Sequence, residues 1–133
     1  MCFHYFGTAD DGGVHTNSGV QNFWFYLLAN EGSGINDNGI SYNVTGIGFE
    51  KASAIAYRNL KIYLHPTDSF PAAVLGSIQS AEDLYGINSP ESNAVKNAWC
   101  AVGLSTCSTP FASDNINDRI WLLTHEQKLI GKK

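Results

Sequence analysis

Apolar side chains recur with helical spacing in four stretches of the chain. The first stretch follows the i, i+3, i+4, i+7, i+8 pattern of an amphipathic helix, with Val20, Phe23, Trp24, Leu27 and Leu28. Three later stretches carry similar stripes, formed by Ala52, Ile55, Ala56, Leu60 and Tyr63, by Val74, Ile78, Ala81 and either Leu84 or Tyr85, and by Val95, Ala98, Trp99 and Val102. The pattern predicts helices near residues 18–30, 49–64, 70–85 and 90–102.

Residues suited to helix ends flank these stretches. Asn17 or Ser18 can cap the start of the first helix, and Ser89 the start of the fourth. Gly86 and Gly103 follow the third and fourth stripes, where helices commonly end in a left-handed glycine. These signals predict a mainly α-helical fold, a bundle with an extended N-terminal segment.

The remaining segments lack helical periodicity. Residues 1–16 are predicted to be extended chain and loop, and residues 36–39 (NDNG) to be a turn. Apolar positions alternate from 40 to 44, which is typical of a short strand or an extended arm. Residues 104–133 form a tail whose apolar cluster at 120–123 suits either a short helix or a strand.

Composition narrows the function classes. The 133 residues fit one domain or one lobe of a larger domain. The formal net charge of −4 argues against a nucleic-acid-binding module, and no apolar run approaches the roughly 20 residues of a membrane span. Charged residues make up 15% of the chain, below the roughly 25% of soluble domains, which suggests that part of the surface is covered.

The chain has three cysteines and no Cys-x-x-Cys pair. Cys100 and Cys107 lie seven positions apart and could close a small loop in an oxidising compartment. Two ordinary thiols are the alternative. Cys2 is left over and is expected to be free.

The sharpest chemical feature is the sequence DDGGVHTNSG at residues 10–19. Two glycines allow a tight turn that could bring Asp10 beside His15. A carboxylate on one imidazole nitrogen fixes the tautomer and favours the charged ring, and the other nitrogen can then stabilise an oxyanion. The alternative is a histidine that merely caps a turn at the start of a helix.

This stretch resembles the histidine motif of the thermolysin family of zinc metalloendopeptidases. Further segments resemble the C-terminal helical lobe of that family in the right order, namely GIG at 46–48, AYR at 56–58, YLHPT at 63–67, AEDLYG at 81–86 and VKNAWCAVG at 95–103. The resemblance implies that residues 1–103 are part of this lobe and that the active site lies in a cleft between two lobes.

By the same resemblance, His15 is similar to the family histidine that hydrogen-bonds the tetrahedral intermediate. Asp10 matches the carboxylate that orients that histidine. Asp11 departs from the usual asparagine, so the local charge differs.

The zinc-binding half of the family's site is absent from this sequence. No HExxH occurs in the sequence. His125 and Glu126 match its first two positions, but they are followed by Gln, Lys and Leu, so the second histidine is missing. His4 and His65 have no ligand partner at i+4 and are predicted to be structural or exposed. The resemblance therefore implies zinc in the complete enzyme, bound by residues outside this chain, and no metal ligand or cofactor here.

Two functions follow as hypotheses. The first is the C-terminal lobe of a secreted zinc metalloendopeptidase, inactive alone, with an N-terminal catalytic lobe and peptide substrates as partners. The second is a stand-alone, non-catalytic binding or assembly module derived from that lobe. An in-frame HExxH upstream of Met1 favours the first. Where the missing lobe would pack, the chain is expected to expose apolar surface or to self-associate. In the second hypothesis, residues 104–133 or dimerisation would cover this interface.

Overall fold

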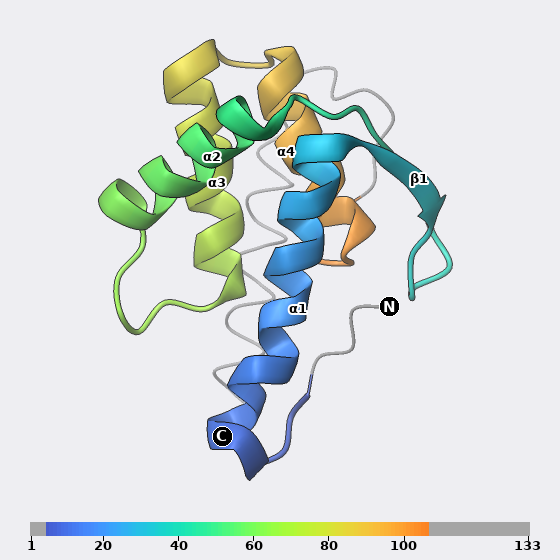
Figure 1. Cartoon of the computed structure of the whole chain (residues 1–133), viewed down its shortest axis with the longest axis vertical. Coiled ribbons are helices and arrows are strands. Elements are labelled where there is room, and N and C mark those ends of the chain that lie inside the picture. The colour runs from blue at the N-terminus through green and yellow to red at the C-terminus, as the bar shows by residue number, and fades with distance from the viewer. Residues whose placement is uncertain (1–4, 107–133) are drawn as a thin grey trace.

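Helices dominate residues 5–106, the part of the chain that the computed structural model describes. The elements in chain order are α1 (Ala9–Asn30), β1 (Gly32–Ile35), β2 (Ser41–Val44), α2 (Phe49–Arg58), the π-helical turn η1 (Asn59–Tyr63), α3 (Phe70–Tyr85) and α4 (Pro90–Ala101) (Figure 1). The predicted mainly α-helical fold is confirmed. Within the described residues, the strands form a single two-stranded sheet.

The bounds of α3 and α4 agree with the sequence pattern to within one residue. The Ser89 hydroxyl accepts a hydrogen bond from the backbone N–H of Ser92 at 3.1 Å, as expected of an N-cap. At the other end of α4, Gly103 takes a φ of +79° and its N–H donates to the carbonyl of Cys100. The N–H of Leu104 donates to the carbonyl of Trp99, which completes a Schellman motif.

The second predicted helix ends differently from its apolar pattern. The right-handed α-helix stops at Arg58, and a π turn carries the chain onward, with the N–H of Leu64 donating to the carbonyl of Asn59. Asn59 is buried, and its amide nitrogen donates to the carbonyl of Ala73 in α3 at 2.9 Å. A Cβ added to Gly76 would lie 2.1 Å from the Asn59 side-chain oxygen. This close contact between Asn59 and α3 is a tertiary interaction, so the spacing of apolar residues along the chain does not predict it.

An exposed polar network centred on Asp83 also stabilises the π turn. Asp83 of α3 accepts hydrogen bonds from Arg58, from the Tyr63 hydroxyl and from the amide of Gln79. These donors favour the charged carboxylate and hold the pKa of Asp83 below its ordinary value, the Tyr63 hydroxyl having the largest effect. The network joins α2, η1 and α3.

The expected strand is half of a β-hairpin. β2 pairs antiparallel with β1, with Gly32 opposite Val44 and Ile35 opposite Ser41. The turn lies at residues 36–39 as predicted, and the Asn36 side-chain oxygen accepts hydrogen bonds from the backbone N–H groups of Asn38 and Ile40. The amide nitrogen of Asn36 donates to the carbonyl of Cys100 at 3.0 Å, which docks the hairpin on the end of α4.

The core joins α1, α3 and α4 through two tryptophans. Trp24 of α1 stacks on Trp99 of α4, with ring centroids 4.7 Å apart and planes inclined by 18°. The indole nitrogen of Trp99 donates to the Ser77 hydroxyl of α3 at 2.7 Å. All three side chains are fully buried. Water therefore cannot reach the indole N–H of Trp99 to take the place of the Ser77 hydroxyl.

Replacing Ser77 with alanine is expected to lower the free energy of unfolding by about 1–3 kcal/mol more than replacing Ser80, because it leaves a buried indole N–H unpaired. The two serines are matched: both are buried in α3, and each hydroxyl donates to a carbonyl of its own helix. Only Ser77 also accepts from Trp99. Equilibrium urea unfolding of both variants measures the difference, and equal losses would contradict it.

Several sequence predictions concern residues outside the described range. Cys100 is disulfide-bonded, but Cys2 and Cys107 both lie outside the described residues. The predicted tail at 104–133 is described only for residues 104–106. The division of the chain at residue 103 therefore stays a prediction, as does the element at 120–123.

Candidate catalytic site at the start of α1

A run of four left-handed residues opens α1. The φ angles are 55° at Asp10, 47° at Asp11, 83° at Gly12 and 80° at Gly13. Glycine adopts such angles without a steric penalty, and aspartate tolerates them better than most residues. The expected extended segment is therefore shorter than predicted: helical structure begins at Ala9, and the right-handed helix follows Gly13.

This turn brings Asp10 and His15 together through two contacts. One carboxylate oxygen of Asp10 accepts a hydrogen bond from the backbone N–H of His15 at 3.0 Å. The other lies 2.6 Å from the ring nitrogen Nδ1. The first N–H groups of a right-handed helix have no carbonyl of their own helix to bond. Asp10 therefore supplies the cap that the sequence pattern assigned to Asn17 or Ser18, and it orients the imidazole with the same carboxylate.

The contact with Asp10 defines the role of each ring nitrogen. An ionised carboxylate can only accept, so Nδ1 of His15 carries the proton in this hydrogen bond. Nε2 is then the nitrogen available to another molecule, and it is a donor when the ring is an imidazolium. The His15 side chain is 88% exposed, whereas that of Asp10 is 39% exposed. The pair thus presents an oriented hydrogen-bonding group to whatever lies against this end of α1.

Asn17 and Tyr5 hold the turn in place. The Asn17 side-chain oxygen accepts from the backbone N–H of Tyr5 at 2.7 Å. Its amide nitrogen lies 3.1 Å from the carbonyl of Tyr5 and 3.2 Å from that of Gly12. A Cβ added to Gly13 would lie 2.3 Å from Tyr5 Cδ1, so the ring packs directly on this glycine. Sequence reasoning missed both residues as parts of the site, because the contact spans twelve positions and leaves no local pattern.

The described residues do not fit a catalytic metal. Within residues 5–106, no group of three or more His, Cys, Asp or Glu side chains could hold a metal ion. His65 is exposed and pairs with Asp68, whose carboxylate accepts from the His65 backbone N–H at 2.8 Å and lies 3.2 Å from Nδ1. The backbone N–H of His65, and secondarily its ring, hold the pKa of Asp68 below the ordinary value. His4 and His125 lie outside the described residues.

Over the described part of the chain, no helix combines the length and the apolar character that crossing a bilayer requires.

Comparison with known proteins gives consistent matches. A family model described as the alpha-helical domain of thermolysin metallopeptidase matches residues 1–104. Bacillolysin of Bacillus cereus is 48% identical over 101 residues, which cover 76% of this chain and 17% of the relative. Thermolysin of Alicyclobacillus acidocaldarius subsp. acidocaldarius is 49% identical over 102 residues, which cover 75% of this chain and 17% of the relative. Bacillolysin of Brevibacillus brevis is 42% identical over 100 residues, which cover 75% of this chain and 18% of the relative. The chain spans less than a fifth of the length of these relatives.

Proposed function

Since this chain belongs to the thermolysin metallopeptidase family, as part of its alpha-helical domain, we propose that it is the C-terminal lobe of a secreted zinc metalloendopeptidase. Its exposed Asp10–His15 pair would form one wall of the substrate cleft. The observation that carries the proposal is the 2.6 Å contact between the Asp10 carboxylate and His15 Nδ1, which leaves Nε2 for substrate.

In this proposal His15 stabilises the oxyanion that develops as water adds to the scissile carbonyl. A donor aimed at that oxygen acts mainly in the transition state, because the ground-state carbonyl carries little charge. Asp10 is a positioning residue that fixes the ring tautomer and orientation. The left-handed turn and the Asn17–Tyr5 contact hold Asp10 in reach of the ring.

Zinc would be held by residues outside this chain, because the described residues offer no ligand set and the sequence has no HExxH. When bound, the metal would supply the Lewis acid of the complete enzyme. This chain contributes orientation and oxyanion stabilisation, which do not suffice for peptide hydrolysis. We therefore propose that the chain is inactive alone.

Exposed apolar side chains support an upstream lobe as partner. Large hydrophobic residues are exposed at eleven described positions, among them Phe6 at 78%, four positions before Asp10, and Val14 at 53%, directly before His15. Exposed hydrophobic side chains that gather in a contiguous patch are typical of an interface. In the absence of the upstream lobe, the same surface would favour self-association.

Complementation tests the proposal. The 133-residue chain alone is expected not to hydrolyse casein, and adding the upstream segment of the same gene product, with its HExxH, is expected to give chelator-sensitive hydrolysis. The upstream segment alone is the control. Chelator-sensitive hydrolysis by the 133-residue chain alone would contradict the proposed division of labour, and an upstream gene sequence without HExxH would favour the non-catalytic module.

A further inference from the structure

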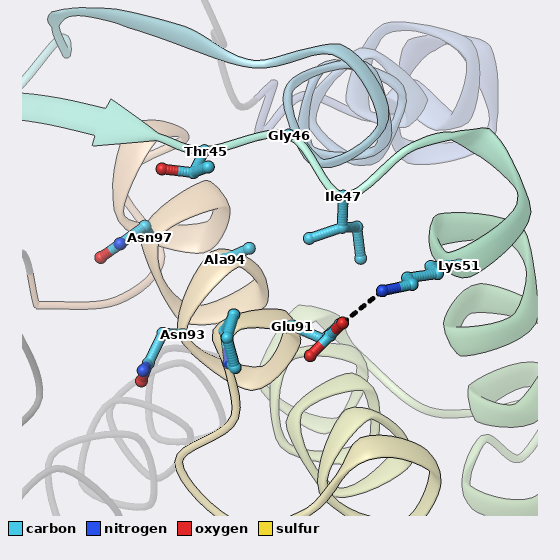
Figure 2. Close-up of a pocket in the computed structure, with 9 residues that line it drawn as sticks. Thr45, Gly46, Ile47, Lys51, Glu91, Asn93, Ala94 and Asn97 are labelled. Carbon is cyan, nitrogen blue, oxygen red and sulfur yellow. Dashed lines mark hydrogen bonds and ion pairs between the residues drawn. The ribbon is translucent and has the colours of Figure 1, made fainter.

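A second polar site lies at the end of α1 opposite His15. The backbone N–H groups of Ile47 and Gly48 donate to the carbonyls of Leu28 and Ala29 in the last turns of α1. This places the connection from β2 to α2 beside the far end of the helix, near the start of α4 (Figure 1). A pocket of about 430 Å³ opens between this connection and the first half of α4 (Figure 2).

Two opposite charges meet at one side of the pocket. The Lys51 ammonium lies 2.6 Å from a carboxylate oxygen of Glu91, as Figure 2 shows. The Lys51 side chain is 50% exposed and that of Glu91 is 13% exposed. The hydrogen bond from Lys51 holds the pKa of Glu91 below its ordinary value, and the same bond raises that of Lys51. Both groups are therefore charged at neutral pH.

The rest of the pocket combines apolar and amide surface. Ile47 and Ala94 face each other across it, from the connection and from α4 (Figure 2). Asn93 and Asn97 line it from consecutive turns of α4. The side-chain oxygen of Asn93 is buried and has no hydrogen-bond partner. Its amide nitrogen donates to the carbonyl of Asn88 at 3.3 Å, and in Figure 2 this side chain points away from the Lys51–Glu91 pair.

We propose that this pocket binds a free α-amino acid with an aliphatic side chain. Its ammonium group would bond to Glu91 and its carboxylate to Lys51, so that four charges alternate in sign. Its side chain would lie against Ile47 and Ala94. A free amino acid fits better than a peptide, because its two charges flank a single carbon atom, whereas peptide termini are at least one further residue (about 3.8 Å) apart. The assignment is independent of the peptidase function.

Ligand analogues test the proposal on the unmodified 133-residue chain. Titration with L-leucine, followed by methyl NMR, is expected to shift the Ile47 and Ala94 signals saturably. N-acetyl-L-leucine retains only the negative charge and L-leucinamide only the positive charge, so each is expected to bind at least tenfold more weakly. Absence of saturable shifts with leucine, or equal binding of either analogue, would overturn the proposal.

Variants supply a second test of the same pocket. Glu91→Gln and Lys51→Met are each expected to weaken leucine binding at least tenfold. Lys61→Met, in η1 and outside the pocket lining, is the matched control and is expected to bind leucine as the unmodified chain does. Undiminished binding by either pocket variant would refute the assigned contacts. If a variant does not fold, the analogue series on the unmodified chain decides the matter alone.

Discussion

Replacing His15 with alanine in the complete peptidase is expected to lower kcat about a hundredfold or more, with a much smaller change in KM. The expected size is that of losing one oxyanion donor. The change falls on kcat because the lost hydrogen bond forms mainly in the transition state. Steady-state kinetics on a defined peptide substrate measures both constants.

The chain contains a matched control for this variant. His65 is also exposed and also contacts an aspartate through its backbone N–H and Nδ1. His65→Ala is expected to leave kcat within about twofold of normal. A His15→Ala enzyme with near-normal kcat would remove His15 from the mechanism.

The part played by Asp10 can be separated from its role as a helix cap. Asp10→Asn is expected to lower kcat in the presence of His15 and to have little further effect in a His15→Ala background. Such non-additivity identifies a residue that acts through another. Additive losses would mean that Asp10 contributes only to stability or acts independently.

The second large effect is expected from Gly13→Ala, which should lower the free energy of unfolding by about 3 kcal/mol or more. A left-handed φ costs an L-residue about 1–2 kcal/mol, and overpacking a filled site costs about 1–3 kcal/mol. Gly13 combines both costs, because its φ is +80° and the new Cβ would lie 2.3 Å from Tyr5. Urea unfolding measures the loss.

Gly12→Ala separates the two costs. Gly12 has a φ of +83°, but nothing lies within 4 Å of its added Cβ. It is expected to lose only the conformational part, about 1–2 kcal/mol. Tyr5→Ala is expected to relieve the steric part of Gly13→Ala and none of Gly12→Ala. Equal losses for the two glycine variants would show that the packing of Tyr5 on Gly13 is energetically unimportant.

The helices predicted best from sequence are those whose ends are encoded locally. α3 and α4 have proline in their first turn and glycine after their last, and these residues act through their own backbone. β1 was not predicted because its four residues, GSGI, show no alternation and only Gly32 is partly buried. The π turn was missed because it depends on a contact between Asn59 and α3, fourteen positions away.

The same distinction explains how far the candidate site could be predicted. The proximity of Asp10 to His15 follows from two glycines between them and requires no knowledge of the rest of the fold. The sequence of four left-handed residues does not follow, because Asp10 and Asp11 pay a steric cost for such angles that glycine does not, and no local pattern signals that they adopt them. The pocket at Lys51 and Glu91 joins residues forty positions apart and leaves no trace in any local pattern.

The short separation of Asp10 and His15 also bears on the order of events during folding. Five positions separate them, and twelve separate the Tyr5 and Asn17 that brace them. Closing loops this short costs little chain entropy and takes on the order of 10–100 ns. Nucleation of α1 can therefore orient the His15 imidazole against Asp10 before the slower packing of α1 on the other helices is complete. The Asp10–His15 contact would then already exist when the long-range contacts form, so the late steps of folding would position this pair within the fold and would not have to assemble it.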